Sequence, residues 1–326
     1  MRGLPCTGNG PGAPAQRRVV SERHRCRRGR GRNDATRTRL AQIKKEARGA
    51  MTARLTDWIG QQETQDDVLH AQPSRFMQAT LDREPSLEDG DALPPLWHWL
   101  YFLSAKPMRA LGHDGHPAKG GFLPPIELPR RMWAGGRFAF NQPLVLGQPA
   151  RKQSTILKVT EKEGRSGQLC FVTVEHCITQ YGAVAVREEH DIVYRDHPSL
   201  DAKPVPTVPT LDHADFSETV QPSEVLLYRY SALTFNGHRI HYDSDYARGV
   251  EGYDGLVFHG PLTATLLVDL AMRHVERTPT AFEFRGTAPI SGPAAFHIEG
   301  RQTGSAVELW ARRGDGACAM TAQAIF

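Results

Sequence analysis

The residues of this chain whose types could do chemistry gather in a short polar segment that runs from Asn236 to Asp243. It holds two imidazoles, His238 and His241, and an imidazole can take and return a proton near neutral pH. The tripeptide His259-Gly260-Pro261 follows and leads straight into an apolar run. This combination favours proton transfer beside a polarised carbonyl group.

The apolar run after Pro261 extends from Leu262 to Met272 and mixes large apolar with small residues all the way round. This pattern predicts a helix that is buried on every side. A proline just inside a helix start is preorganised for it, and Gly260 lets a ligand approach the backbone closely. The free N–H groups and the helix dipole at this start predict a place where a carbonyl oxygen gains charge.

Strand-like runs surround these two pieces and must position them. The run from Leu226 to Leu233 is apolar and predicts a strand before the polar segment. Residues 131–194 hold β-branched, alternating runs that are separated by glycine-containing turns and predict further strands. The chain ends in more runs of this kind, over Ala281–Pro289, Ala295–Gln302, Ala306–Arg312 and Ala317–Phe326.

The region before these strands has a different pattern. Residues 55–81 look helical, and Pro73 divides them into two pieces. Residues 93–103, LPPLWHWLYFL, present a large apolar surface, which predicts core packing or a wall for an acyl chain. Each half of the chain thus offers helical or apolar material followed by long strands, and four prolines mark a linker over residues 198–209. This order predicts an internal duplication of an α+β unit.

The segment His113-Asp114-Gly115-His116 raises the possibility of a metal site. It lies in a loop rich in glycine and proline, and no third ligand follows at a standard spacing. A turn with solvated histidines is the prediction here, and we expect no metal ion and no cofactor in this protein.

Charge is distributed unevenly along the chain. Residues 1–50 hold 14 of the 40 Lys and Arg, and the remaining residues carry a net charge of −7. The tail almost lacks large apolar side chains, so we expect it to be disordered. Because the folded part is acidic, a nucleic-acid partner would have to bind the tail alone, and we expect none.

Five cysteines at scattered positions predict reduced thiols rather than a disulfide framework. Apolar runs stay shorter than the roughly 20 residues that a membrane span needs, and the N-terminus lacks a secretory apolar core. We therefore expect a soluble, cytoplasmic protein without a membrane partner.

Several strings of the chain resemble the MaoC-like hydratases and dehydratases. They are similar to the two-domain branch that includes 3-hydroxyacyl-thioester dehydratase type 2 and the mesaconyl-CoA and itaconyl-CoA hydratases. The resemblance covers about residues 53–326 and rests on YSALTFNGHRIHYD (230–243), GLVFHGPLTATLL (255–267), LPPLWHWLYF (93–102), FLPPIELPRRMWAGG (122–136) and EEHDIVYR (188–195).

The resemblance implies an α+β double hot-dog fold, in which two antiparallel sheets each wrap a central helix and form one continuous sheet. It divides the chain into a tail (1–50), an N-terminal non-catalytic hot dog (51–200) and a C-terminal catalytic hot dog (201–326). The N-terminal half would complete the sheet and shape the acyl tunnel. Such a chain would act as a monomer of two hot dogs or as a homodimer.

The resemblance also implies the roles of residues in the polar segment. In the single-domain relatives, an aspartate stands five residues before the catalytic histidine. Here the histidine falls on His241 and the aspartate on Asn236, as is usual in the two-domain branch. His241 would then serve as the base, Asn236 would orient water, and the Gly260 N–H would hold the thioester oxygen. Further candidates, for binding a substrate carboxylate or CoA phosphate, are His238, Arg239, His259 and Arg285.

The implied function is a hydro-lyase of acyl-CoA metabolism that hydrates an enoyl-CoA, with a C5-dicarboxylic thioester (mesaconyl-C4-CoA or itaconyl-CoA, giving citramalyl-CoA) as the favoured substrate. One alternative is a 3-hydroxyacyl-thioester dehydratase of fatty acid metabolism. Another is a non-catalytic protein that binds acyl-CoA, with Asn236 as a sign of lost activity. A hot-dog thioesterase is disfavoured, because it needs a carboxylate early in the central helix and Pro261 to Leu267 hold none.

Overall fold

The computed structural model describes residues 55–164, 167–196, 208–210 and 213–326. The basic tail and the predicted linker around residue 200 lie outside the described residues, apart from the linker's ends. The predicted disorder of the tail and the domain boundary at residue 200 therefore stay predictions. Among the residues described, no helix is both long and apolar enough to cross a membrane.

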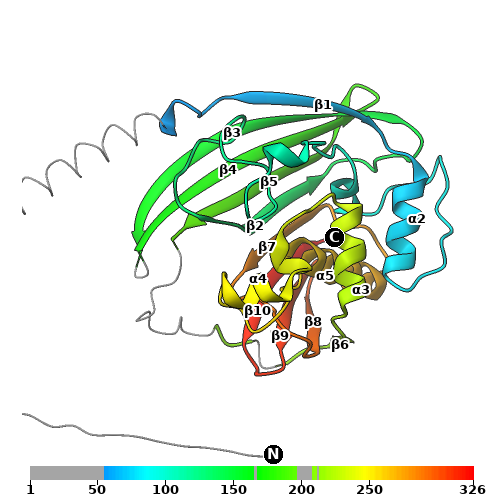
Figure 1. Ribbon diagram of the computed structural model, residues 1–326. Coiled ribbons are helices and arrows are strands. Elements are labelled where there is room, and N and C mark those ends of the chain that lie inside the picture. Colours follow the sequence, from blue (N-terminus) through cyan, green and yellow to red (C-terminus); the bar gives the residue numbers. More distant parts are fainter. Residues whose placement is uncertain (1–54, 165–166, 197–207, 211–212) are drawn as a thin grey trace, which may run out of the picture. The chain divides into compact units, whose positions relative to one another are not determined.

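Ten antiparallel strands form one sheet in the order β1-β3-β4-β5-β2-β7-β10-β9-β8-β6 (Figure 1). The first five strands in the chain make one half of it, which we call the N-terminal half-sheet. Their alternating, β-branched sequences suit the pleated surface of a sheet. These strands are β1 (Gln62–Val68), β2 (Arg130–Phe140), β3 (Pro149–Gly164), β4 (Gly167–Gln180) and β5 (Ala183–Arg195).

The last five strands make the C-terminal half-sheet and repeat the same topology. The order β1-β3-β4-β5-β2 of the first half corresponds to β6-β8-β9-β10-β7 in the second. This agreement of strand order fits the duplication predicted from the order of elements. These strands are β6 (Phe216–Val220), β7 (Ala281–Gly286), β8 (Phe296–Thr303), β9 (Ala306–Arg313) and β10 (Cys318–Ile325).

The two half-sheets join where β2 pairs with β7. Phe138 lies opposite Phe282, and Gly136 lies opposite Phe284. The side chains of Phe138, Phe282 and Phe284 are buried in one core cluster, and we call their side of the sheet the inner face. Residues that are direct neighbours across paired strands share a face, so the register assigns the inner face across the whole sheet.

Helix α5 (Gly260–Val275) packs against β7, β8, β9 and β10 of the C-terminal half-sheet (Figure 1). None of its residues from Leu262 to Ala271 is exposed, which confirms the helix predicted to be buried on every side. Apolar strand residues face it, among them Phe296, Ile298 and Leu309. This helix begins at the polar segment and fixes where that segment lies.

Helix α3 (Glu224–Leu233) replaces the strand predicted over Leu226–Leu233, and this prediction is wrong. Its buried residues, Leu227, Tyr230 and Ser231, recur at helical spacing and form one face. Ser223 caps its start, because its hydroxyl oxygen accepts the Leu226 N–H. The apolar and aromatic composition of this run is typical of a strand, so composition alone did not reveal the helical spacing.

The helix predicted over residues 55–81 is also only partly right. Residues 62–68 form β1, which pairs with β3, and a helix, α2 (Ala71–Thr80), follows. Pro73 does not divide a helix but lies in the first turn of α2, where its missing N–H removes no bond. α2 packs against α3 and against the short 3₁₀ turn η1 (Trp97–Leu100).

The remaining helical elements are short. They are η2 (Met108–Ala110) in the N-terminal half, with η3 (Arg239–His241) and α4 (Ser244–Gly249) in the C-terminal half. Between β1 and β2 the described residues contain α2, η1 and η2 but no counterpart of α5. The N-terminal half-sheet therefore lacks the central helix that its topology leads one to expect.

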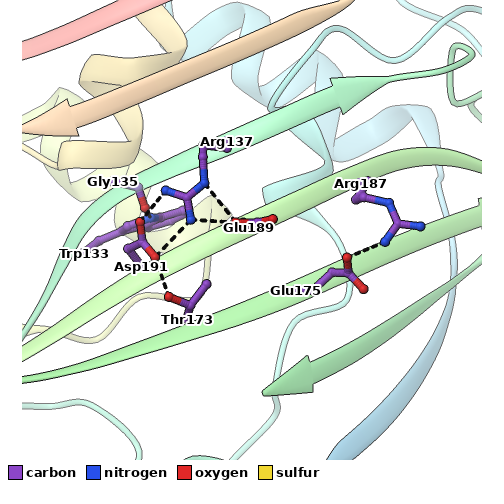
Figure 2. A network of polar contacts seen from close by, with 8 residues as sticks. All are labelled: Trp133, Gly135, Arg137, Thr173, Glu175, Arg187, Glu189 and Asp191. Atoms are coloured by element: carbon purple, nitrogen blue, oxygen red, sulfur yellow. Dashed lines mark hydrogen bonds and ion pairs between the residues drawn. The ribbon is translucent and has the colours of Figure 1, made fainter. Parts of the chain in front are cut away.

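Paired charges occupy the outer face of the N-terminal half-sheet (Figure 2). Arg137 binds Glu189 through Nη2 at 2.7 Å and Asp191 through Nη1 at 2.6 Å. The hydroxyl of Thr173 donates a further hydrogen bond of 2.7 Å to Asp191. Arg187 pairs with Glu175 on the same face.

Candidate active site

The polar segment predicted from the sequence begins where α3 ends. The backbone N–H of Asn236 donates to the carbonyl of Ser231, and that of Phe235 donates to Ala232. Phe235 adopts a left-handed conformation with φ of 50°, which is costly for an aromatic residue. This helix-ending motif turns the chain sharply and holds Asn236 directly beyond the helix.

His241 lies at the end of η3 and is 7% exposed. Its Nδ1 lies 2.7 Å from the carbonyl oxygen of Val257, which can only accept, so Nδ1 carries the proton. The tautomer leaves the lone pair on Nε2, the atom that a base would use. Burial lowers the pKa of His241 to about 4, and the imidazole is neutral at pH 7.

His259 stacks on His241 with ring centroids 3.6 Å apart and an interplanar angle of 17°. It is fully buried, and its Nε2 lies 2.9 Å from the hydroxyl oxygen of Ser231. Its Nδ1 has no hydrogen-bond partner among the described residues. Burial and the neighbouring His241 and His238 hold the pKa of His259 well below its usual range. His259 is therefore a neutral support beneath His241 rather than an exposed contact for a substrate.

Asn236 is held by its own segment. Its Oδ1 accepts the backbone N–H of His238 at 3.0 Å, so its side-chain oxygen is already occupied. Its Nδ2 donates no hydrogen bond to any residue that the structure describes and can donate to a water molecule. Asn236 lines a cavity together with Pro261 of α5.

Gly260 is the first residue of α5, and Pro261 follows in the first turn. The Gly260 N–H lies at the helix start, where N–H groups have no partner within the helix. A Cβ placed on Gly260 would meet no atom within 4 Å, so space is open in front of this residue. The helix start can thus take a carbonyl oxygen against its N–H and its dipole.

His238 meets the loop that contains Asp114 and His116. The ring centroids of His238 and His116 lie 4.1 Å apart, and His116 Nδ1 lies 3.2 Å from Oδ2 of Asp114. Burial, together with the neighbouring His116 and His241, lowers the pKa of His238 to about 2. The prediction of a turn with solvated histidines is wrong for His116, since this loop covers the polar segment.

Arg239 ties the same loop to the site. Its guanidinium binds Asp243 at 2.7 Å, lies 4.2 Å from the Tyr246 ring centroid and donates to the His113 carbonyl oxygen. Its backbone N–H donates to the Asp114 carbonyl oxygen. The predicted role of Arg239 in binding substrate is not supported by these contacts, which fasten two loops together.

Arg285 lies apart from the other predicted residues. It follows the inward-facing Phe284 in β7, so its exposed side chain points to the outer face of the sheet. It lines a separate hollow of about 830 Å³ that shares no lining residue with the cavity at Asn236. The structure does not bring Arg285 to the site predicted for it.

The cavity at Asn236 has a volume of about 300 Å³ and lies between the N-terminal half-sheet with its η1 segment on one side and helices α3 and α5 on the other. Tyr230, Thr234 and Pro261 line it from the C-terminal half. Its other wall includes Trp99 and Phe102 from the apolar segment over residues 93–103. Trp97 and Leu100 of that segment belong to the core, as predicted for packing, while Trp99 and Phe102 face the cavity. Its role as a wall for an acyl chain stays a prediction.

Sequence reasoning missed a row of polar residues on the inner face of the N-terminal half-sheet, which we call the polar row. Ser154 lies opposite His176 and His176 opposite Glu188, which in turn lies opposite the inward-facing Phe138. Lys152 lies two positions before Ser154 in β3, and His190 lies two positions after Glu188 in β5, so both side chains share this face. All but Ser154 line the cavity, and the row consists of Lys152, Ser154, His176, Glu188 and His190.

Glu188 is 2% exposed and is held by N–H donors from η1. His98 Nε2 lies 2.9 Å from its Oε2, and Trp99 Nε1 lies 3.2 Å from its Oε1. Burial opposes its charge, but His98 and the neighbouring histidines outweigh this and lower the pKa of Glu188 to about 2. Burial lowers the pKa of His176 to about 4 and that of His190 to about 3.

Two groups of residues have ligand atoms within 4.8 Å of one another and could in principle hold a metal ion. One is Asp114, His116 and His238, and the other is His176, Glu188 and His190. In the first, the Asp114 carboxylate already binds His116. In the second, both oxygens of Glu188 already accept N–H groups. In both groups the carboxylate is thus already engaged by hydrogen bonds within the protein.

The three cysteines that the structure describes, Cys170, Cys177 and Cys318, are free thiols. This agrees with the prediction of reduced cysteines. Burial raises the pKa of each of these thiols, so they are poor nucleophiles at neutral pH.

Comparison with known proteins shows which family this chain resembles. Residues 96–292 match the family described as hydroxyacyl-thioester dehydratase type 2. A mesaconyl-C(4)-CoA hydratase of Chloroflexus aurantiacus is 47% identical over 267 residues, which are 81% of this chain and 95% of that protein. The mitochondrial hydroxyacyl-thioester dehydratase type 2 of Schizosaccharomyces pombe is 27% identical over 68% of this chain and 81% of its own length.

Solved structures extend the likeness to the fold. HtdX of Mycobacterium tuberculosis superposes with a TM-score of 0.58 at 15% identity, over 80% of this chain and 98% of its own. At this identity the similarity concerns the fold alone. The fold is the double hot-dog expected from the sequence, with its central helix present in the C-terminal half.

Proposed function

We propose, because the chain belongs to the hydroxyacyl-thioester dehydratase type 2 family, that it is a hydro-lyase which adds water reversibly to an enoyl-CoA. One observation carries this proposal. His241 is buried, neutral and fixed by Val257 in the tautomer that leaves Nε2 free, beside the start of α5. Such an imidazole is a base that needs no metal ion to accept a proton.

The proposed reaction begins with the thioester oxygen at the N–H of Gly260. Positive charge at the helix start stabilises the enolate oxygen more strongly than the neutral carbonyl oxygen, so it lowers the barrier. Water donates one proton to Nε2 of His241 while its oxygen forms a bond to the β-carbon. The electron pair of the double bond moves onto the thioester as an enolate.

The second half of the reaction returns the proton. The imidazolium of His241 donates it to the α-carbon as the enolate collapses, so one water molecule is added in total and the imidazole is regenerated. Asn236 holds the water through its Nδ2, since its Oδ1 is bound to the backbone of His238. His259 supports the His241 ring by stacking on it.

We further propose that the substrate is a C5-dicarboxylic enoyl-CoA, mesaconyl-C4-CoA or itaconyl-CoA, and that the product is citramalyl-CoA. The relative at 47% identity bears the name of a mesaconyl-C(4)-CoA hydratase, and its match extends over most of both chains. A dehydratase of fatty 3-hydroxyacyl thioesters is the second candidate. It is favoured only by the more distant yeast relative at 27% identity.

The experiment that tests this function follows the enoyl-thioester absorbance after mixing the protein with mesaconyl-C4-CoA, itaconyl-CoA and enoyl-CoAs of C4 to C16. We expect the band to decay with mesaconyl-C4-CoA or itaconyl-CoA for the wild type. Decay with none of the thioesters would favour a protein that only binds acyl-CoA. Fast decay with long chains and none with the C5 substrates would favour the fatty acyl alternative.

A further inference from the structure

Of the residues in the proposed reaction, Asn236 lines the cavity from its C-terminal side, and the reaction gives no task to the polar row. Yet Lys152, His176, Glu188 and His190 line the same cavity as Asn236. A thioester held at Gly260 with its β-carbon near Asn236 would direct the rest of its acyl group into this space. The chemistry of the row should therefore match whatever the acyl group carries beyond the double bond.

We propose that Lys152, His176 and His190 bind a second carboxylate of the acyl group on the side of the cavity formed by the N-terminal half-sheet. This inference rests on the proposed function, because it names the part of the enoyl thioester that these residues recognise. By this inference, the N-terminal half-sheet, which lacks the central helix, determines which acyl group is bound.

Lys152 is a cation without an anion. Its ammonium makes no ion pair or hydrogen bond with any residue that the structure describes, and its Nζ lies 5.3 Å from the Phe102 ring centroid. Burial lowers its pKa, so the group is partly stripped of water. On the outer face of the same half-sheet, by contrast, Arg137 and Arg187 each bind a carboxylate. A substrate carboxylate would give Lys152 the partner that these arginines have.

His176 and His190 present their rings to the same space. Nδ1 of His176 lies 2.8 Å from the Ser154 hydroxyl, which leaves Nε2 for a ligand. The His190 ring contacts the Trp133 ring at a tilt of 31° with centroids 3.9 Å apart, and neither of its nitrogens bonds to a described residue. Neutral imidazoles can each donate one N–H to a carboxylate oxygen.

Glu188 does not compete with this ligand for its donors. His98 and Trp99 donate to its two oxygens, which fixes the carboxylate against η1. Burial lowers the pKa of Lys152, and among its charged neighbours Glu188 opposes this most strongly. The row therefore holds one fixed anion and one cation that lacks a direct partner.

The dimensions and walls of the cavity favour a short acyl group. A volume of about 300 Å³ is at the small end of the range for ligand pockets. A long hydrocarbon chain in this space would bury Lys152, His176 and His190 without hydrogen bonds, which is unfavourable. The charge of Lys152 also opposes a metal ion at His176, Glu188 and His190.

The first experiment compares two substrates that differ only at the recognised group. Mesaconyl-C4-CoA and 3-methylcrotonyl-CoA share their carbon skeleton, but a methyl group replaces the carboxylate in the second. We expect kcat/KM of the wild type to favour mesaconyl-C4-CoA by about 10²–10³-fold, because unpaired polar groups in the site reject the analogue. Equal kcat/KM values would overturn the inference and leave the hydratase function intact.

The second experiment changes the cation. Lys152→Met should lower the ratio of the two kcat/KM values by about 10²-fold through KM for mesaconyl-C4-CoA, whereas Lys152→Arg should keep most of it. The matched control is Lys158→Met, since Lys158 lies on the same strand but lines the hollow on the outer face. The control should keep the wild-type ratio. An unchanged ratio in Lys152→Met, with an unchanged circular dichroism spectrum, would remove Lys152 from the recognition site.

A third experiment separates this inference from the reaction itself. Succinyl-CoA and butyryl-CoA also differ by a carboxylate and cannot be hydrated, so calorimetry measures their binding alone. Tighter binding of succinyl-CoA supports the inference even if no enoyl-CoA is hydrated, an outcome that would defeat the proposed function only. Equal affinities, or an activity that EDTA abolishes and Zn²⁺ restores, would contradict carboxylate recognition by the row.

Discussion

The two half-sheets share one topology but differ in the chemistry of their inner faces. In the C-terminal half, Phe296, Ile298 and Leu309 form an apolar surface that closes over α5. In the N-terminal half, the polar row lies on the inner face, and the space in front of it is a cavity. A central helix needs an apolar partner surface, so the same strand order gives a core around a helix in one half and a cavity in the other.

The comparison predicts where substitutions matter most. His241→Ala should lower kcat by about 10²–10⁴-fold with a modest change in KM, because the proton acceptor is lost. The absorbance assay with mesaconyl-C4-CoA measures this, and Arg285→Ala on the outer face is the control that should keep its activity. Near-normal turnover of His241→Ala would place the chemistry elsewhere, and His238 would be the next residue to substitute.

Stability should depend on the half that holds the helix. Leu267 is fully buried in α5, so Leu267→Ala should lower the free energy of unfolding by about 3 kcal/mol through lost contacts and a cavity. Urea denaturation measures this value. Lys152→Met in the polar row should change it far less, since a cavity already exists there. If both substitutions cost the same, the proposed contrast between a core and a pocket is wrong.

Acid should weaken both halves through their neutral histidines. The pKa of His241 is about 4 in the folded chain and near 6.5 when unfolded, so the unfolded state binds more protons between these values. Stability is then lost as pH falls from 6.5, by about 2 kcal/mol at pH 5 for this one residue. The pKa values of His176 and His190 are lowered in the same direction.

Urea denaturation at pH 7 and pH 5 tests this dependence in both halves. His190→Gln removes one such group from the N-terminal half and should reduce the loss of stability between the two pH values. His213→Gln, at an exposed histidine that pairs with Asp215, serves as the control. A wild type that is equally stable at both pH values would refute the buried, neutral state of these histidines.

The smallest effect should come from Asn236→Asp. A carboxylate in this position can still hold water by accepting its hydrogen bond, so we expect substantial activity to remain, reduced by less than about tenfold. Asn236→Ala should be impaired more strongly, because no group then holds the nucleophile. The same absorbance assay ranks the two variants. The reverse ranking would mean that Asn236 acts through its bond to the His238 backbone alone.

The sequence predicted those parts of the fold that have a strong local pattern. Alternation predicted β3 to β5 and β7 to β10, and apolar residues on all sides predicted α5. It failed for α3, where LLYRYSAL has the composition of a strand but buries residues at helical spacing. It failed also for β1, whose polar sequence QETQDDV forms a strand only because β3 provides a partner.

The candidate site likewise contains residues that could be predicted from the sequence and residues that could not. His241, Asn236 and Gly260 stand close along the chain and could be singled out by type and spacing. Lys152, His176 and Glu188 are far apart in sequence and meet only through strand register. A weak signal existed, because His176 interrupts the inward apolar positions Val172, Val174 and Ile178 of β4. Single polar interruptions of this kind gain meaning only once the neighbouring strands are known.

The junction of β2 and β7 has a consequence for how this protein can change. In a symmetric pair of identical chains, every substitution occurs twice and must suit both copies. Here one chain supplies both sides of the junction, so each side is encoded separately. A helix can be absent on one side and kept on the other, and a substitution in the polar row leaves the residues of the C-terminal half unchanged. Selectivity and reactivity can therefore vary independently within a single gene product.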